Sequence, residues 1–507
     1  MTTTAPETTP GSPGVAGKGL KLGAIGLLSS IVIAVASTAP GYSAAATLGG
    51  IAQEVGDRGP IIMLLAFLPM LFVSYAYKSL NNESPDCGTS FTWVARTLGR
   101  RTGWLVGWVI VVADIIVMAS LAQIAASYTF QLFGLHDLAA NKLALILAGS
   151  AWILLMTWIA WRGIELSART QYLLLGAELL ILAIFSVVAL VKVYAGSAGE
   201  QAIKISWDWF NPFTLSFSAL SAGFLLAVFI YWGWDSAVAA NEETTEPSVN
   251  PGRAAVISTL VLLATYLIIT IATQAYAGVG EEGIGLANPE NENDVFAVIG
   301  QSVLGSWGGK LLIIAVLTSA AASTQTTILP TARTTLAMAA YKALPRSFGK
   351  VHPRNQTPTL STWAMGIVSV AFFAGLYALS EAGLSDLILS IGLMIAFYYG
   401  LTGLASAWRY RRQLRAGFRA ALQKVIMPLL GALLLFAAFV KTAIDLLDPE
   451  SGDTTLLGVG GAFVYGIGSI LLGIVLMIIY NIVSPAYFRG GTMEPEGAGP
   501  EHDRASP

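Results

Sequence analysis

The chain has 507 residues, of which 55% are hydrophobic and only 11% are charged, and its formal net charge is −2. A soluble globular protein carries about 25% charged residues, so this composition argues against a soluble multi-domain protein. The apolar residues instead come in runs of about 20, which is long enough to cross a hydrocarbon core of about 30 Å.

Both ends of the chain are polar. The first residues are rich in Thr, Pro and Gly, and they lack the basic and apolar parts of a signal peptide. We expect a disordered cytoplasmic tail over residues 1–18, a twelve-helix membrane domain over 19–485, and a second disordered cytoplasmic tail over 486–507.

Hydropathy predicts an all-α integral membrane protein with about twelve transmembrane helices. The expected spans, in chain order, are 20–50, 60–80, 103–133, 142–161, 169–194, 216–240, 254–278, 310–340, 360–380, 384–407, 425–446 and 456–483. If the N-terminus is cytoplasmic, 22 of the 28 Lys and Arg residues fall on the cytoplasmic side. This bias predicts a multi-pass protein of the cell (inner) membrane with both termini in the cytoplasm.

The first expected span is interrupted. It contains Pro40 and Gly41 in mid-run, and proline can neither donate a backbone hydrogen bond nor fit against the preceding helical turn. A broken helix must line a protein cavity, since lipid cannot satisfy free backbone groups; the alternative is a simple proline kink. A half-helix that begins near Gly41 to Ser43 would offer free N–H groups to a carboxylate.

The sixth expected span has a matching interruption, in which Gly233 lies between two tryptophans and is followed by Asp235. The alternative is an aromatic patch with a chance glycine. The two interrupted spans are five apart, so a five-helix repeat would return inverted, and paired interruptions in inverted halves indicate a transporter binding site. Free carbonyls near Tyr231 to Gly233 would suit an ammonium, so an α-amino acid fits both breaks.

Three acids, Asp114, Glu178 and Asp235, fall within spans. A charged group costs about 2.5 to 3.5 kcal/mol at the centre of a lipid-facing helix, so these side chains should face the interior. They are candidates for proton coupling or charge sensing, and the alternative is hydrogen bonding between helices. Glu242 and Glu243 lie near the cytoplasmic end, where a structural salt bridge or a solvated position is the favoured reading.

Four segments together resemble the amino acid–polyamine–organocation superfamily of permeases, over roughly residues 20 to 483. They are the broken first helix, the loop Pro85 to Trp108, the stretch Gly233-Trp234-Asp235 that leads to Pro247, and the loop Leu344 to Pro358. The resemblance implies a permease domain with an inverted repeat of five plus five helices, the leucine-transporter-like fold, two further helices, and rocking-type alternating access.

The resemblance also implies site residues. Ser37, Thr38, Ala39 and Gly41 match the segment of the first helix that binds the substrate carboxylate. Tyr231, Trp232 and Gly233 match the amine-facing break, and Phe229 matches an aromatic residue that caps the substrate in some members.

Two positions depart from the family pattern. The first helix reads Thr-Ala-Pro-Gly-Tyr where many members have a Gly-Ser-Gly type segment. Glu178 stands where proton-coupled members can carry a lysine, so coupling through a lysine is not expected.

The eighth expected span is rich in hydroxyl groups. In the resembled fold this helix approaches the first helix, where sodium-dependent relatives hold the ion, which makes Ser319, Ser323 and Thr324 a possible ion site. The alternative is that small hydroxyl residues let the helices pack closely.

These features predict a secondary active transporter that moves amino acids or closely related amines by alternating access. One alternative is a polyamine or cationic amino acid importer or exchanger of the putrescine type, and a second is a non-transporting membrane sensor. An H-E-x-x-H motif, a P-loop and a mid-span histidine are all missing, which argues against an enzyme, a catalytic or metal site and a cofactor. A channel is disfavoured because the sequence has no filter-like repeat.

The expected partners are a small amino acid or amine, a coupling proton or sodium ion, and the lipid bilayer. The basic run Arg409 to Arg419 is expected to contact anionic lipid rather than nucleic acid.

Overall fold

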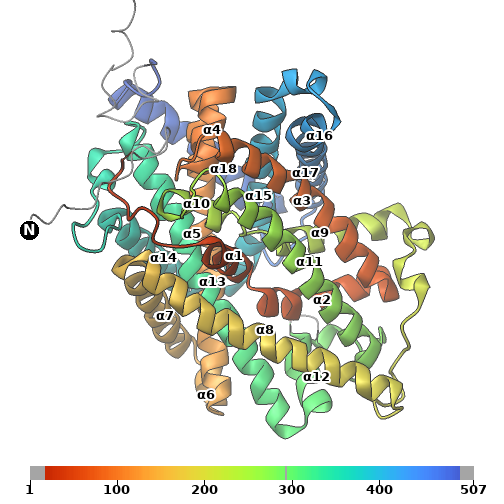
Figure 1. The fold of residues 1–507 in the computed structure, drawn as a ribbon. Helices are drawn as coiled ribbons and strands as arrows, with labels where there is room; N and C mark the ends of the chain where they lie inside the picture. Colours follow the sequence, from red (N-terminus) through yellow and green to blue (C-terminus); the bar gives the residue numbers. More distant parts are fainter. Residues whose placement is uncertain (1–16, 292–293, 491–507) are drawn as a thin grey trace, which may run out of the picture.

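The computed structural model describes residues 17–291 and 294–490 (Figure 1). In these two ranges the chain is helical apart from loops, two isolated bridges and one short hairpin of β1 (Thr455–Leu456) and β2 (Val459–Gly460). Ten of the described helical segments are long and apolar enough to cross a membrane, and Leu27–Glu83 counts among them as one stretch. The prediction of an all-α, multi-pass membrane protein is confirmed.

The helices of the first part follow one another with short connections. They are α1 (Leu27–Ser37), α2 (Pro40–Val55), η1 (Gly56–Arg58), α3 (Gly59–Glu83), α4 (Thr89–Leu98), α5 (Arg100–Leu132), α6 (His136–Ala139), α7 (Lys142–Arg162) and α8 (Ile164–Tyr194).

The second part begins with a loop that holds two short 3₁₀ turns. Its helices are η2 (Trp207–Phe210), η3 (Pro212–Thr214), α9 (Phe217–Ile230), α10 (Ser236–Ala239), η4 (Asn241–Glu243), α11 (Asn250–Ala277), η5 (Pro289–Asn291), α12 (Val295–Leu304), α13 (Ser306–Ala340), η6 (Arg346–Gly349), α14 (Thr359–Leu379), α15 (Glu381–Arg409), η7 (Arg411–Arg415), α16 (Phe418–Ala421), η8 (Leu422–Ile426), α17 (Met427–Asp445) and α18 (Gly461–Val483).

Several helix starts follow from local chemistry. The side chains of Asn141, Ser216 and Ser380 each accept a hydrogen bond from the first turn of the helix that they precede, as N-cap residues do. Pro40, Pro60 and Pro251 lie at the start of their helices, where the N–H that proline lacks has no partner within the helix.

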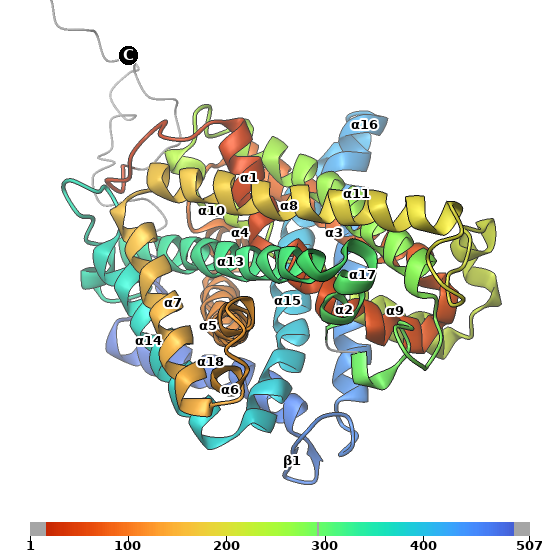
Figure 2. The same cartoon turned by 90° about the horizontal axis from the view of Figure 1, so that it is seen from below.

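The broken helices lie in the middle of the molecule. Helix α1 packs against α8, α11 and α13, and α10 packs against α11 and α13, while Figure 2 shows α8 and α13 running side by side across the molecule. The outer surface is apolar: on α8, Leu173, Leu180 and Val187 are exposed, whereas Glu178 on the same helix is fully buried. Such an apolar outer surface with buried acids matches a lipid environment.

The N-terminal helix starts later than expected. Residues 17–26, here called the N-terminal strap, are not helical, and α1 begins only at Leu27 rather than at residue 20. Ile25 explains the difference: its N–H donates to the carbonyl of Glu243, and its carbonyl accepts from the N–H of Thr245. The strap therefore pairs with a distant loop instead of extending α1.

The folded part reaches into both expected tails. Lys18 and Tyr487 are buried, although the first lies inside the expected tail 1–18 and the second inside the expected tail 486–507. The remainder of both expected tails, residues 1–16 and 491–507, lies outside the described residues.

Candidate functional site

The interruption expected in the first span is present. Helix α1 ends at Ser37 and α2 begins at Pro40, with Thr38 and Ala39 between them. Ala39 adopts a left-handed conformation with φ +46°, which costs a non-glycine residue roughly 1–2 kcal/mol. The chain is thus a broken helix here, not only a kinked one.

The N–H groups at the start of α2 are already hydrogen-bonded. The Gly41 N–H donates to Oε1 of Glu178 at 2.7 Å, the Tyr42 N–H donates to Oγ of Ser319 at 3.2 Å, and the Ser43 N–H donates to the Ala39 carbonyl at 2.8 Å. The expectation of free N–H groups over Gly41 to Ser43 is therefore wrong for this conformation. Side chains of α8 and α13, remote in sequence, occupy two of them.

The second interruption lies beside the first. Helix α9 ends at Ile230 and α10 begins at Ser236. Between them Gly233 has φ +117°, and a Cβ on this residue would lie 2.7 Å from the Ser37 carbonyl oxygen. The hydroxyls of Ser37 and Ser236 are 2.7 Å apart, so the two breaks are in direct contact.

Tyr266 of α11 contacts both breaks. Its hydroxyl donates to the Ile230 carbonyl at 2.7 Å and lies 3.5 Å from the Thr38 carbonyl. Carbonyls freed by a helix break need a donor when they are buried. The Tyr266 hydroxyl supplies it to Ile230, and the Ser43 hydroxyl donates to the Thr38 carbonyl at 2.8 Å.

A cavity of about 620 Å³ opens beside the breaks. Of the predicted substrate residues, six line it: Ser37, Thr38, Ala39, Phe229, Trp232 and Gly233. Gly41 and Tyr231 are not among the lining residues, and the Tyr231 hydroxyl instead donates to the Met63 carbonyl at 3.1 Å. The volume is in the range typical of small-molecule sites.

The cavity reaches one side of the molecule. Its rim includes Glu54 near the end of α2, Leu226 on α9 and Leu389 on α15, all of which are exposed. The end of α2 lies beyond the first break from the N-terminal strap, because α1 connects the strap to that break.

Asp235 lies at the inner end of the cavity and accepts three hydroxyl hydrogen bonds. Tyr399 donates to Oδ1 at 2.9 Å, and Tyr398 and Tyr77 donate to Oδ2 at 3.2 and 3.4 Å. The Trp232 indole N–H donates in turn to the Tyr398 hydroxyl. These donors stabilise a negative charge on Asp235.

The other two intramembrane acids occupy different positions. Asp114 also lines the cavity, and its Oδ2 accepts a hydrogen bond from the Thr331 hydroxyl at 2.5 Å. Glu178 is not a lining residue; it lies behind α2, bound to the Gly41 N–H, and its Oε2 is buried without a hydrogen-bond partner.

The three hydroxyl residues of α13 that were predicted as a possible ion site do not all contact the first break. Ser323 donates to the Ser37 carbonyl at 2.9 Å, and Ser319 accepts from the Tyr42 N–H, so both contact the first break. Thr324 instead donates to the Ala320 carbonyl within its own helix at 2.7 Å.

The tyrosines around Asp235 were not predicted from the sequence. Tyr77 comes from α3, whereas Tyr398 and Tyr399 come from α15, and no local pattern connects these segments. The feature of the sequence that could have indicated two of them is the polar pair Tyr398-Tyr399, which lies in the middle of an apolar span.

A second cluster of charges joins Glu242 to Lys18 and Asp86, two residues that were not predicted from the sequence. Lys18, Asp86 and Glu242, here called the Lys18 cluster, join the N-terminal strap to the loop before α4 and to η4. The Lys18 ammonium lies 2.5 Å from Oε1 of Glu242 and 3.1 Å from Oδ2 of Asp86, and all three side chains are at most 3% exposed.

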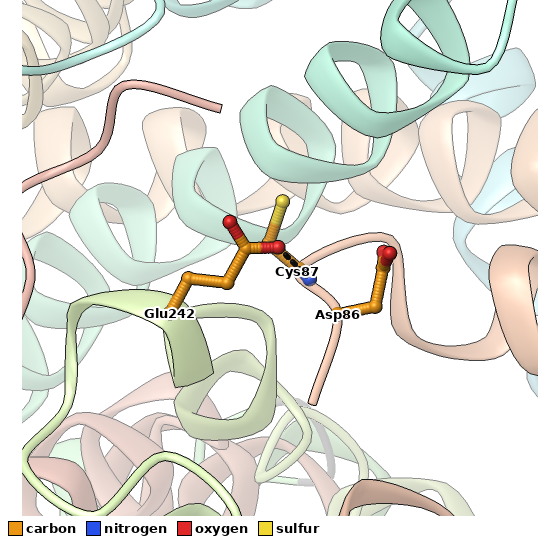
Figure 3. A group of neighbouring side chains, drawn as sticks. All are labelled: Asp86, Cys87 and Glu242. Atoms are coloured by element: carbon orange, nitrogen blue, oxygen red, sulfur yellow. Dashed lines mark hydrogen bonds between the residues drawn. The ribbon is translucent and has the colours of Figure 1, made fainter. Parts of the chain in front are cut away.

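Figure 3 shows the Glu242 carboxylate directed at Cys87, whose N–H donates to Glu242 Oε1 at 3.0 Å, with Asp86 next to it in the chain. Ligand atoms of Asp86, Cys87 and Glu242 lie within 4.8 Å of one another, which is a spacing that a metal ion could use. In this structure the Lys18 ammonium supplies the positive charge between the two carboxylates.

The ion pairs shift the pKa values of the cluster. Burial on its own raises the pKa of the Asp86 carboxyl, but the Lys18 ammonium and the Arg96 guanidinium outweigh burial and hold this pKa at about 2. Burial lowers the pKa of Lys18, and the nearby carboxylates outweigh it, so this pKa lies well above its usual range. The ionised forms are therefore the stable ones.

A second ion pair closes the same side. Arg333 of α13 donates from Nε and Nη2 to the two carboxylate oxygens of Glu243 at 2.9 and 3.0 Å, and both side chains are fully buried. Of the two readings favoured for Glu242 and Glu243, a structural salt bridge or a solvated position, the contacts show the salt bridge. These ion pairs and the strap pairing all involve η4 or the residues next to it.

Comparison with known proteins gives a consistent picture. The amino acid permease family profile matches residues 25–459. The chain is 24% identical to the methylthioribose transporter of Bacillus subtilis, covering 75% of this chain and 80% of that protein. It is 25% identical to the branched-chain amino acid permease BcaP of the same organism, over 68% and 72% of the two chains. It is also 25% identical to the vacuolar cationic amino acid transporter 4 of Arabidopsis thaliana, over 69% and 57%.

These relatives are transporters of small molecules, not enzymes, and the family profile covers most of the chain, including both helix breaks. The chain therefore belongs to the amino acid permease family of membrane transport proteins.

Proposed function

We propose that this protein is a secondary active transporter that moves amino acids or closely related amines across the cytoplasmic membrane by alternating access. The observation that carries the proposal is the contact of two interrupted helices beside one cavity. Buried helix breaks are tolerated in membrane proteins where they line such a cavity, and they characterise transporter sites.

The proposed fold has twelve crossings. Helices α1 and α2 form the first crossing, α9 and α10 form the sixth, and α3, α5, α7, α8, α11, α13, α14, α15, α17 and α18 form the others. The first ten would make the inverted repeat of five plus five helices. The bias of Lys and Arg supports cytoplasmic termini, in which case the cavity faces outward in this conformation.

The proposed substrate site comprises Ser37, Thr38, Ala39, Gly41, Phe229, Tyr231, Trp232 and Gly233. Cavity-lining positions among them would contact the solute directly. Gly41 and Tyr231 would act by shaping the breaks, since the first binds Glu178 and the second binds Met63.

We propose coupling to a proton or a sodium ion through groups at the breaks. Asp235 and Asp114 line the cavity, so a change of charge on either residue would alter the binding of the solute. Glu178 is hydrogen-bonded to the start of α2, so a change of its charge would alter the geometry of the first break. Ser319 and Ser323 contact the first break and remain the candidates for an ion site, with Thr324 beside them.

Two alternatives remain. A polyamine or cationic amino acid importer or exchanger is favoured specifically by the acids that line the cavity. A non-transporting sensor would use the same cavity for binding without carrying out exchange.

The test is uptake and counterflow in proteoliposomes, with and without imposed proton and sodium gradients. The proposal expects saturable, protein-dependent counterflow of an amino acid or amine, and it expects Asp235→Asn to change the pH dependence of uptake. Binding without counterflow would support the sensor and contradict transport. An unchanged rate and pH profile in the variant would remove Asp235 from the coupling mechanism.

A further inference from the structure

A second cavity lies away from the helix breaks, where neighbouring helices end. It has a volume of about 350 Å³ and is bounded by the last turns of α3, by the chain just after α15, and by η8. Helices α3, α15 and α17 pack against one another (Figure 1). Lys18 of the strap binds Asp86, which follows shortly after the end of α3, so the cavity lies at the strap end of this helix.

The lining of this cavity is polar throughout. All nine of its described lining residues carry a hydroxyl, amide or charged side chain. The side-chain amides of Gln413 and Gln423 and the hydroxyl of Tyr75 line it without a hydrogen-bond partner among the residues that the structure describes. Amides, hydroxyls and ammonium groups are all hydrogen-bond donors, so the cavity suits a ligand that is rich in acceptors.

Two lysines line the cavity from different elements. Lys78 belongs to α3 and Lys424 to η8, and neither ammonium forms an ion pair with a described residue. The Lys78 ammonium lies 5.5 Å from the centre of the Tyr75 ring. The Lys424 ammonium lies 5.1 Å from the centre of the Tyr410 ring. A cation–π contact orients an ammonium group without neutralising its charge.

The surroundings add further positive charge. Arg253 of α11 and Arg419 of α16 lie close enough to Lys78 to repel its ammonium. The acid that lines the cavity, Glu83, is already bound by Arg409, whose Nε donates to Oε1 at 2.9 Å. The cavity therefore carries an excess of positive charge, which a phosphate group would neutralise while it accepts hydrogen bonds from the free donors.

The unusual helix geometry of η8 shapes one wall of the cavity. Leu422–Ile426 form a π-helical turn between α16 and α17, and this turn carries both Gln423 and Lys424. The Ser406 hydroxyl of α15 donates to the Lys424 carbonyl at 3.2 Å and so connects the turn to α15. Single π-helical turns are rare and are frequent at functional sites. This one brings an amide and an ammonium to the cavity from adjacent positions.

The neighbouring surface indicates a lipid as the source of the phosphate group. Ile426 of η8 and Leu430 and Leu433 of α17 are exposed. Their spacing places them on one face of the helix, so they form an apolar stripe that begins close after Lys424. Acyl chains would cover such a stripe in a membrane, whereas a soluble phosphate would make no use of it.

We propose that this cavity binds the phosphate group of an anionic membrane lipid, with Lys78 and Lys424 as its charged contacts and the acyl chains along the apolar stripe. The arginines of the run Arg409 to Arg419 do not line the cavity, so this site is distinct from a general contact of that run with the bilayer. Basic pockets between membrane helices bind lipid headgroups in this way. The proposal depends on neither the cargo nor the direction of transport.

The experiment measures binding of short-chain lipids to the purified, delipidated protein in a non-ionic detergent. The probes are dioctanoyl phosphatidylglycerol, dioctanoyl phosphatidylcholine and inorganic phosphate. Native mass spectrometry counts the retained lipids, and tryptophan fluorescence gives the affinity from the rise in unfolding temperature. We expect one retained phosphatidylglycerol per chain, bound at least about tenfold more tightly than phosphatidylcholine, a factor equivalent to 1.4 kcal/mol.

Variants locate the site. Lys78→Gln and Lys424→Gln should each weaken binding of phosphatidylglycerol about fivefold, the equivalent of about 1 kcal/mol per lysine near an anionic lipid. If Lys78→Gln does not fold, Lys424→Gln carries the test, because the contact of Lys424 with Ser406 is made by the backbone. The matched control is Arg411→Gln. Its guanidinium lies over the Trp408 ring at 4.7 Å and outside the cavity, so the affinity should not change.

Several results would overturn the proposal. Equal affinity for phosphatidylcholine and phosphatidylglycerol would show that the excess charge is not read. Unchanged binding in Lys424→Gln, or equal weakening in Arg411→Gln, would indicate diffuse attraction to the basic surface instead of a defined site. If inorganic phosphate raised the unfolding temperature as much as the lipid at equal concentration, the site would be one for soluble phosphate and the assignment of a lipid would be wrong.

Discussion

Gly233 is the residue on which the contact between the two breaks depends. Its φ of +117° is a conformation that favours glycine, and the Ser37 carbonyl lies only 2.7 Å from the place of a Cβ. Any side chain would therefore strain its own backbone and push α1 away from the second break.

We predict that Gly233→Ala reduces transport by roughly 5- to 150-fold, because the strain and the backbone clash together cost roughly 1–3 kcal/mol in this conformation. The measurement is initial uptake rate in proteoliposomes at equal protein density. The matched control is Gly176→Ala, at an exposed position on α8 where a Cβ would meet no atom within 4 Å. Equal activity of the two variants would contradict the close approach of the breaks.

Asp86 links stability to pH. Its pKa of about 2 in the folded protein lies below the value of about 3.9 expected in an unfolded chain. A lowered carboxyl pKa stabilises the fold fully above pH 3.9, and this contribution is lost as the pH falls toward 2.

The corresponding prediction concerns the difference between wild type and Asp86→Asn. The gap in unfolding free energy should be largest above about pH 4 and should shrink between pH 4 and pH 2 by about 2 kcal/mol, from the size of the shift. Thermal unfolding in detergent, followed by tryptophan fluorescence, measures it. A gap that stays constant over this range would mean that the ion pair does not set the Asp86 pKa.

The N-terminal strap is the element that pairs with residues 243–245, at the end of η4 and just after it. It is fixed by the Ile25 backbone pairing and by the Lys18 ammonium between two buried carboxylates. Removing one partner from a buried ion pair costs about 3–5 kcal/mol, so loss of Lys18 should favour release of the strap.

Release of the strap can be measured by the reactivity of Cys87. This residue is the chain's single cysteine and is fully buried next to the Lys18 cluster. We predict that Lys18→Met increases the rate of Cys87 labelling by a maleimide reagent at least about tenfold, a factor equivalent to 1.4 kcal/mol.

The control for this measurement is Lys21→Met. Lys21 pairs with Glu165 at 2.8 Å, but both side chains are nearly half exposed, and such surface pairs contribute at most about 1 kcal/mol. Labelling that is unchanged in Lys18→Met, or raised equally in both variants, would show that the Lys18 cluster does not hold the strap.

At the level of elements, the sequence was informative where the signal was local. Pro40-Gly41 and Gly233 predicted both breaks, since proline and glycine act on their own backbone. The strap was missed because its extended conformation comes from pairing with Thr244 and Thr245, far along the chain. Glu178 was expected to be functional, but its hydrogen bond with the Gly41 N–H could not be predicted, because this contact depends on how α8 packs against the first break.

The whole molecule is closed on one side of the breaks and open on the other. The cavity reaches the exposed residues Glu54, Leu226 and Leu389, whereas the strap, the Lys18 cluster and the Arg333–Glu243 pair fill the opposite side. The proposed alternating access would require the buried ion pairs to separate as the rim closes.

The most direct test of the central claim is protection of a cysteine placed inside the cavity. Val117 of α5 lines the cavity and is partly exposed, so Val117→Cys in a Cys87→Ser background should react with a membrane-impermeant thiol reagent added on the side opposite to the N-terminus. The solute with the strongest counterflow should slow this reaction in a saturable way, with half-protection near its transport KM. Labelling at a rate that the solute leaves unchanged, or labelling only from the N-terminal side, would contradict a binding site between the two helix breaks.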